Sequence, residues 1–307
     1  MRRVYTIGET VMDIVFRNNV PVAAKAGGSM LNVAVSLGRL KVPVRFISEF
    51  ANDQVGEIIH SFLTENSIDT SFIYRYNNGK SAIALAFLDE HQKATYNFYK
   101  LYPGERLKIA IPDIQQGDIV MFGSYFGIAP EIRSVLIRIL KEAKSQGAII
   151  IYDPNFRKAH LHQLNELLPY IKENLGLADI VKGSDEDFEN IFDVKNARDA
   201  FHKLNDFSKI LVYSRGKEGV DFYSNKHEFH IDAQNIEPLS TIGAGDNFNA
   251  GIAFCLLKNN IFREELPDQE IETWKNIIQT GVDFASEVCL SYDNYLSENY
   301  ASDYLKK

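Results

Sequence analysis

The chain has 307 residues, of which 45% are hydrophobic and 24% are charged, so its composition is that of a globular protein with a sizeable core. Its formal net charge of -8 argues against non-specific binding to nucleic acid, which requires a basic face, but leaves phosphorylated ligands possible. No apolar run approaches the roughly 20 residues of a membrane span. The N-terminal run is too short for a signal peptide, so we expect a cytoplasmic protein without membrane contact.

The first hundred residues begin with a buried strand that ends at Gly8-Glu9, and open α/β sheets bind ligands at such strand ends. A hairpin turn at Asn18-Asn19 and a helix with a glycine-rich start follow. The expected strands are Val4–Ile7, Ile14–Arg17, Val20–Ala24, Val42–Phe50, Phe72–Tyr76, Ser81–Leu88 and Thr95–Lys100, and the expected helices are Met30–Leu40 and Val55–Leu63.

Two strand pairs interrupt the alternation of strand and helix in this half of the chain. We expect residues 13–25 and 81–101, the latter with a turn at Asp89–Lys93, to form a small sheet inserted on the main domain. Such a sheet could act as a lid or as a dimer contact, and aromatic pairs across it could simply hold it together. Its edges would otherwise stay unpaired, which supports the hypothesis of a homodimer through these strands.

From residue 118 onward, strands and helices alternate regularly, which predicts a mostly parallel central sheet flanked by helices. The length suits a single α/β domain over residues 1–307. The expected strands are Ile119–Phe122, Ala148–Tyr152, Asp179–Val181, Ile210–Tyr213, Val220–Ser224 and Glu228–Ile231. The expected helices are Pro130–Lys144, Gln163–Asn174, Glu186–Ile191, one that begins near Gly245, and Glu270–Leu290.

The most specific pattern lies in residues 240–251, where Gly243 and Gly245 flank Ala244 and an apolar helical run follows. Unpaired N–H groups at a helix start, reached through a glycine turn, form an anion site suited to phosphate. Asp246 lies in the first turn of this helix. It is either a helix cap or a base beside a bound phosphate.

Other polar residues follow predicted strands or begin predicted helices, and each has a structural and a functional interpretation. Asn32 is either a solvated cap or a partner for ligand hydroxyls. Residues 153–157 form either a turn or a ligand contact at a strand end. Residues 184–187 form either a helix cap or carboxylates presented to Mg2+. Residues 214–219 form a glycine-spaced loop, and the sequence contains no P-loop motif.

Taken together, these motifs resemble the ribokinase (PfkB) family of carbohydrate kinases over nearly the whole chain. The matching residues, in order and at family spacing, are Gly8-Glu9 with Asp13, Gly27-Gly28 with Asn32-Val33-Ala34, Leu37–Leu40 with Asp53 and Gly56, Ser214 with Gly216 and Gly219, and Gly243–Asp246 with Phe248 and Ala250-Gly251. Phe98–Lys100, Pro103-Gly104 and Asp153–Arg157 look most like fructokinases and 2-keto-3-deoxygluconate kinases. The resemblance implies a ribokinase-like α/β fold with a β-sheet lid, ATP as donor with Mg2+, and phosphorylation of a primary hydroxyl of a small sugar.

The resemblance also implies a role for each matching residue. Asp246 would take the proton from the acceptor hydroxyl, and the amides of Gly243, Ala244 and Gly245 would hold the charge on the transferred phosphoryl group. The sugar would be bound by Asp13, Gly27, Gly28, Asn32, Lys100, Asn155 and Arg157. The nucleotide would be bound by Ser184, Ser214, Gly216, Gly219, Gly243 and Gly245, with Asp187 as a Mg2+ ligand.

Three positions depart from the family pattern. Ser240 stands where the family usually carries an acid that helps to hold a monovalent cation, so the resemblance leaves the need for K+ open. The acid at Asp187 is shorter than the family's glutamate. Lys100 replaces an arginine of this branch and loses the bidentate fork that suits a carboxylate, which favours a neutral ketohexose. We therefore expect a fructokinase, with 2-keto-3-deoxygluconate kinase or a catalytically weak sugar- or nucleotide-binding regulator of the same fold as alternatives.

Overall fold

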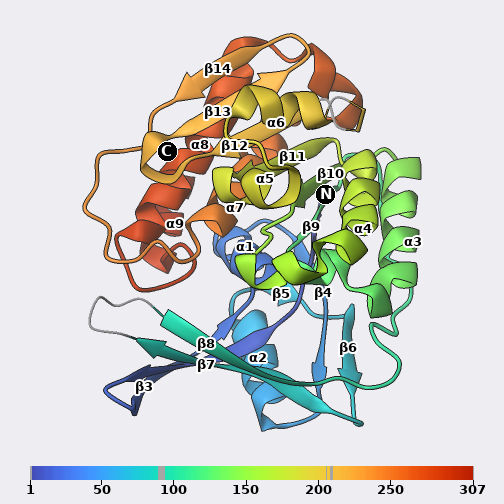
Figure 1. Cartoon of the computed structure of the whole chain (residues 1–307), viewed down its shortest axis with the longest axis vertical. Helices are drawn as coiled ribbons and strands as arrows, with labels where there is room; N and C mark the ends of the chain where they lie inside the picture. Colours follow the sequence, from blue (N-terminus) through green and yellow to red (C-terminus); the bar gives the residue numbers. More distant parts are fainter. Residues whose placement is uncertain (1, 89–93, 205, 208–209, 307) are drawn as a thin grey trace.

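The structure is a computed structural model that describes residues 2–88, 94–204, 206–207 and 210–306. Its strands form a large sheet covered by helices on both faces and a separate small sheet at one end of the molecule (Figure 1). This arrangement confirms the predicted α/β fold with a mostly parallel sheet. None of the described helices combines the length and the apolar character that crossing a bilayer demands.

The large sheet has the strand order β14-β13-β12-β11-β10-β9-β1-β4-β5, with β6 paired to β4. The pairs from β12 through β4 are parallel, and β13 and β14 are added antiparallel. The strands are β1 (Val4–Ile7), β4 (Val44–Ala51), β5 (Ile68–Asp69), β6 (Ile73–Tyr76), β9 (Ile119–Gly123), β10 (Ile149–Asp153), β11 (Ile180–Ser184), β12 (Ile210–Ser214), β13 (Val220–Ser224) and β14 (Glu228–Ile231).

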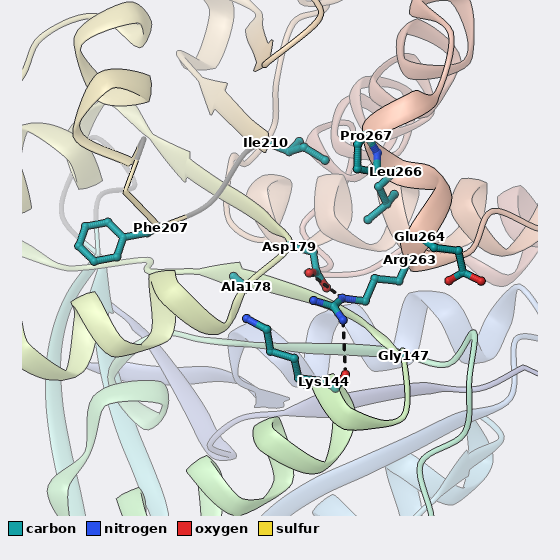
Figure 2. Close-up of a pocket in the computed structure, with 10 residues that line it drawn as sticks. All are labelled: Lys144, Gly147, Ala178, Asp179, Phe207, Ile210, Arg263, Glu264, Leu266 and Pro267. Atoms are coloured by element: carbon teal, nitrogen blue, oxygen red, sulfur yellow. Dashed lines mark hydrogen bonds and ion pairs between the residues drawn. The ribbon is translucent and has the colours of Figure 1, made fainter.

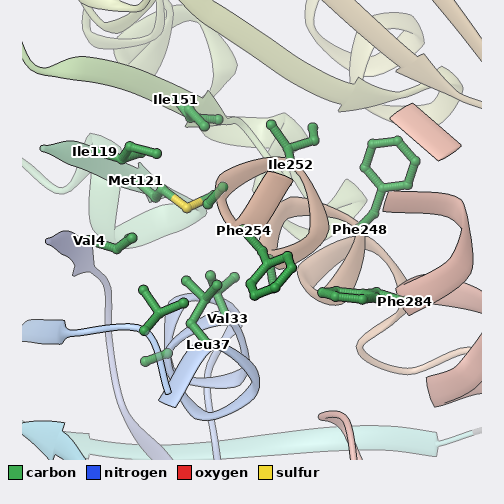
Figure 3. Close-up of a cluster of buried hydrophobic side chains, with 14 of the residues drawn as sticks. Val4, Val33, Leu37, Ile119, Met121, Ile151, Phe248, Ile252, Phe254 and Phe284 are labelled. Carbon is green, nitrogen blue, oxygen red and sulfur yellow. The ribbon is translucent and has the colours of Figure 1, made fainter. Parts of the chain in front are cut away.

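Helices cover the two faces of this sheet and create two hydrophobic clusters. One cluster joins the sheet to α1 (Ser29–Arg39), α7 (Ala244–Lys258), α8 (Ile271–Cys289) and α9 (Glu298–Leu305), and reaches α2 (Gln54–Glu65). Figure 3 shows this cluster around Phe248, Ile252 and Phe254 of α7. The other cluster joins the opposite face to α3 (Arg133–Ser145), α4 (Leu164–Leu177), α5 (Asp185–Phe192) and α6 (Ala197–Leu204). Successive residues of β1 alternate between the clusters, as the two-residue period of a strand requires.

The small sheet, hereafter the lid, consists of β2 (Val11–Arg17), β3 (Val20–Gly27), β7 (Lys80–Leu88) and β8 (Ala94–Leu101) in the order β3-β2-β7-β8. The predicted small inserted sheet is therefore confirmed. Its first strand begins earlier than predicted, so Asp13 lies inside β2 rather than before it. The predicted turn at Asp89–Lys93 lies outside the described residues.

Among the described strands and α-helices, β5, α6 and α9 were not predicted, and one predicted helix was only partly right. Strand β5 has two residues, which are too few to show a period, and α6 and α9 have eight each. The predicted helix Pro130–Lys144 begins with a 3-10 turn before α3. Cys255 and Cys289 are buried and free.

Candidate functional site

The carboxyl edge of the large sheet gathers most of the predicted site residues. Strand β1 lies between β9 and β4. The strands that follow β1 in the sequence are added first on the β4 side and later, from β9 onward, on the other side, so the strand order reverses at β1. At such a reversal the loops separate, and ligands of open α/β sheets bind there. The segment after β1 leads into the lid, and the ends of β10, β11 and β12 follow along the same edge.

The turn before α7 holds Asp246 between two polar donors of α1. Ser29 Oγ donates to one carboxylate oxygen at 2.5 Å, and Asn32 Nδ2 donates to the other at 2.8 Å. Gly243 caps the helix with φ 82°, a left-handed conformation that glycine adopts easily. A side chain there would also meet the Asn294 carbonyl. The turn is therefore held in one shape by the loop that contains Asn294.

The pKa of the Asp246 carboxyl is raised from its usual value. Burial raises the pKa of its carboxyl, the bonds from Ser29 and Asn32 lower it, and the net shift is upward. Asp153 adds to the rise and Lys182 opposes it. A carboxyl whose pKa is tuned in this way, at a strand edge, is typical of a functional site.

The predicted phosphate-binding amides differ in availability. The first amides of a helix have no partner within it. Ala244 N–H donates to the Thr241 carbonyl at 3.3 Å, so its hydrogen is partly engaged in the turn. The Gly243 and Gly245 amides are thus better suited to an anion than that of Ala244.

The predicted sugar residues on the lid side lie together. Asp13 in β2 lies opposite Lys25 in the register of the antiparallel strands β2 and β3. A Cβ at position 27 would meet the Asp13 carboxylate. Burial raises the pKa of Asp13 to about 6, and the charge of Glu9 adds to this. Gly28 similarly lies against the Glu9 carbonyl. These close approaches explain why both positions are glycine.

Lys100 reaches from β8 to the end of β1, where its ammonium pairs with the Glu9 carboxylate at 2.7 Å. Asn155 follows β10 with φ 41° and donates through Nδ2 to Ser124 Oγ at 2.9 Å. Arg157 is exposed, and its guanidinium makes no ion pair with the other described residues. Burial raises the pKa of Tyr96 in β8, with Asp13 adding to the rise and Arg157 opposing it, so the lid lies within electrostatic reach of Arg157.

The predicted nucleotide residues form a second group farther along the sheet edge. Ser184 and Ser214 end β11 and β12 and are paired in register. Gly216 and Gly219 have φ 54° and 90°, conformations suited to glycine, in the loop after β12. A Cβ at position 219 would strike the Ile231 carbonyl, whereas Gly216 has open space around it. The turn that holds Asp246 lies between the two groups because it contacts α1 on one side and β11 on the other.

Asp187 has the helix-capping role that the sequence offered as the alternative to a Mg2+ site. It closes a capping box with Ser184, accepting from the Ser184 amide and hydroxyl at 2.7 Å each. Its other oxygen accepts from the Phe156 amide at 2.5 Å. Three donors thus satisfy this carboxylate, which fits a direct metal ligand poorly, and the geometry favours the capping interpretation. Among the described residues, no group of three or more histidine, cysteine, aspartate or glutamate side chains is arranged for a metal ion.

Ser240 offers only a neutral hydroxyl, which accepts a hydrogen bond from the Ile242 amide at 3.2 Å. The position therefore supplies no charge to a monovalent cation.

Four residues of the site were missed as site residues. Ser29 holds Asp246, and Lys182, Asp153 and Asn249 form a buried polar cluster beneath the turn. Asp153 belongs to the motif at residues 153–157, and Lys182 directly precedes Gly183-Ser184, yet the sequence does not show that either residue is buried. Only packing between β10, β11 and α7 brings them together.

A pocket of about 400 Å³ lies at the other edge of the sheet, near the start of β11 (Figure 2). In this pocket Arg263 pairs with Asp179 at 2.8 Å, and Lys144 Nζ donates to the Gly176 carbonyl at 2.9 Å. None of the predicted site residues lines this pocket. We therefore place the candidate active site at the carboxyl edge.

Comparison with known proteins gives the family of the chain. Residues 1–298 match the model of the pfkB family of carbohydrate kinases. A fructokinase of Rhizobium leguminosarum bv. trifolii is 29% identical over 262 residues, covering 83% of this chain and 79% of that protein. An aminoimidazole riboside kinase of Salmonella typhimurium is 24% identical, covering 87% of this chain and 84% of the relative.

Solved structures agree in fold. The fructokinase of Vibrio cholerae O395 with fructose, ADP and calcium ion superposes with a TM-score of 0.84 at 21% identity, covering 99% of both chains. The aminoimidazole riboside kinase of Salmonella enterica, complexed with aminoimidazole riboside and an ATP analog, also reaches 0.84, at 20% identity, with 99% of this chain and all of that chain covered. At these identities the likeness shows the fold alone.

Proposed function

Because the chain belongs to the pfkB family of carbohydrate kinases, and is therefore a sugar kinase, we propose that it transfers the γ-phosphate of ATP to a primary hydroxyl of fructose. The observation that carries this proposal is the placement of Asp246 beside the glycine turn, held by Ser29 and Asn32. In the proposed reaction, the sugar oxygen bonds to the γ-phosphorus while the bond to ADP breaks. The hydroxyl proton passes to Asp246.

The chain's own groups would contribute mainly position and charge stabilisation, which dominate phosphoryl transfer. The amides of Gly243 and Gly245 would face the charge on the phosphoryl group, preorganised at the start of α7. Ser184, Ser214, Gly216 and Gly219 would surround the nucleotide. When bound with ATP, Mg2+ would offset the negative charge of the phosphates. Asp187, whose carboxylate already accepts three hydrogen bonds, would attract the ion without binding it directly.

The choice of a neutral sugar rests on Lys100. Its ammonium is already paired with Glu9 at 2.7 Å, so its charge is offset by a carboxylate of the same site. Asp13, Asn32 and Asn155 offer oxygen and amide groups suited to hydroxyls. The fructokinase relatives agree with this choice. A 2-keto-3-deoxygluconate kinase is favoured by one observation, the exposed guanidinium of Arg157, which makes no ion pair within the described part of the chain and could bind a sugar carboxylate.

The test is ATP consumption by the purified protein with Mg2+ against fructose, 2-keto-3-deoxygluconate, ribose, glucose, tagatose, adenosine and aminoimidazole riboside, with and without K+. Fructose-dependent turnover supports the proposal. Turnover with the keto-acid sugar alone supports the rival kinase, and an Arg157→Ala variant should then lose it selectively. ATP binding without turnover on any sugar supports the regulator. Because Ser240 offers no charge, we expect K+ to change the rate less than twofold, and Ser240→Asp to increase the response.

A further inference from the structure

The buried cluster beneath the glycine turn contains a charge that the proposed reaction does not yet use. Lys182, in β11, is 5% exposed, and Asp153, in β10, is 3% exposed. Their side chains pair at 3.0 Å, and Asn249 Nδ2 of α7 donates to the same Asp153 oxygen at 2.6 Å. A buried ion pair is costly to desolvate and often stabilises a fold no more than apolar residues of similar volume. Its presence here therefore requires a second explanation.

The position of the ammonium supplies that explanation. A Cβ added at Gly245 would lie 3.0 Å from Lys182 Nζ and, outside its own turn of helix, would have no other described atom within 4 Å. The ammonium thus lies directly against the residue that precedes Asp246. Burial lowers the pKa of Lys182, but Asp153, Asp187 and Asp246 outweigh it and the net shift is upward, so the amine stays protonated.

The charges around Asp246 come from several elements. Asp153 in β10 raises its pKa, Lys182 in β11 lowers it, and the donors Ser29 and Asn32 in α1 lower it as well. The charge of Asp187 in α5 raises the pKa of Lys182. Lys182 is the cation in this group, and Asp153 and Asn249 fix where it stands.

Building on the proposed base role of Asp246, we propose that Lys182 is a positioning residue for phosphoryl transfer: its ammonium, anchored by Asp153 beneath Gly245, holds Asp246 as a carboxylate before the sugar hydroxyl. Because Gly245 has no Cβ, the Lys182 ammonium can lie this close to the turn. Position 245 is therefore glycine for a reason beyond the exposure of its amide.

The experiment compares two variants that both lack the Asp153 charge, Asp153→Asn and Asp153→Asn with Lys182→Met. The second variant leaves no unpaired charge of this pair, and the difference between the two isolates the ammonium. The readout is the titration of the Asp246 carboxyl by 13C NMR with labelled aspartate, with the signal identified by its loss in Asp246→Asn. This readout needs no knowledge of the sugar, so it stands even if fructose is not the substrate.

We expect the midpoint of the Asp246 carboxyl titration to lie about one pH unit higher in the double variant than in Asp153→Asn. The reason is that a nearby positive charge favours the ionised carboxylate and lowers the pKa by about one unit or more. With the sugar that the wild type accepts, the acidic limb of kcat should move in the same direction while the sugar KM changes little. Equal midpoints in the two variants would overturn the proposal and leave Lys182 as a counter-charge for Asp153.

Gly245→Ala provides a second test that does not depend on the folding of the double variant. The new methyl group meets only the flexible end of Lys182 and displaces the ammonium. The Asp246 midpoint should rise above that of the wild type. An unchanged midpoint would contradict the proposed coupling between Gly245, Lys182 and Asp246.

Discussion

At the scale of single residues, the properties of the site come from neighbours that are remote in sequence. The Asp246 carboxylate takes hydrogen bonds from Ser29 and Asn32, more than 200 positions earlier in the chain. Burial raises the pKa of the Asp13 carboxyl, and the charge of Glu9 raises it further. Residue type identified these carboxyl groups as candidates, but their ionisation depends on packing.

Replacement of Asp246 by asparagine tests the proposed base. Asparagine keeps the size of the side chain but cannot accept the proton, so we expect kcat to fall by about 100-fold to 10,000-fold. The affinity for ATP should change little, because the carboxylate contacts α1 rather than the nucleotide loop. Turnover with the accepted sugar and calorimetry with ATP measure the two quantities. A near-normal kcat would exclude the assignment.

The pH dependence of sugar binding tests Asp13. Its carboxyl has a pKa of about 6, raised by burial and by Glu9, so it is ionised above that pH and neutral below it. If the carboxylate accepts sugar hydroxyls, the sugar KM should rise as the pH falls through about 6. Initial rates between pH 5 and 8 measure this. In Asp13→Asn, whose amide does not titrate, KM should be high and should not vary across this range.

At the scale of elements, α7 is the centre of the fold. Its apolar residues pack against the sheet and against α8, and Figure 3 shows Phe254 of α7 beside Phe284 of α8. The two helices approach closely because glycines face each other: a Cβ at Gly251 would lie 2.7 Å from the Gly281 Cα. The same helix begins with the turn that holds Asp246, so its packing also positions the site.

Gly251→Ala should therefore destabilise the protein by about 1–3 kcal/mol, the usual cost of overpacking a tight core. The matched control is Gly104→Ala, since a Cβ there meets nothing within 4 Å. Urea unfolding of both variants gives the free energies of unfolding. Equal stabilities for the two variants would show that the helices can separate without cost.

At the scale of the whole molecule, the lid extends from the main body and exposes apolar side chains on both edge strands. Val22 of β3 is 53% exposed and Tyr99 of β8 is 60% exposed. Unpaired sheet edges favour association with another strand. A homodimer through the lid remains our hypothesis, with a second copy of this chain as the partner.

Sedimentation equilibrium at micromolar concentration tests the dimer. We expect a dimer for the wild type and a shift towards monomer for Val22→Lys, because the added charge would be buried without a partner. Leu305→Lys, at an exposed position of α9, is the control and should sediment like the wild type. A monomeric wild type would rule the hypothesis out.

The periodic patterns were enough to predict the α/β class, the small inserted sheet and most long elements. Apolar strands alternating with amphipathic helices allow few other arrangements. The glycine turn with Asp246 was likewise visible, because its spacing is local. The strand β5 was missed because two residues are too few to show a period, and the short helices α6 and α9 were missed as well.

What only the tertiary structure decided is which polar groups meet. Lys182 and Asp153 look like ordinary strand-end residues in the sequence, yet they pair beneath the turn of α7 because β10 and β11 are adjacent and α7 covers them. For Asp187 the sequence left a helix cap and a Mg2+ ligand as alternatives, and the structure shows the capping box. Sequence periodicity records which face of an element is buried, whereas contacts between distant elements depend on strand order and helix packing, which no local pattern contains.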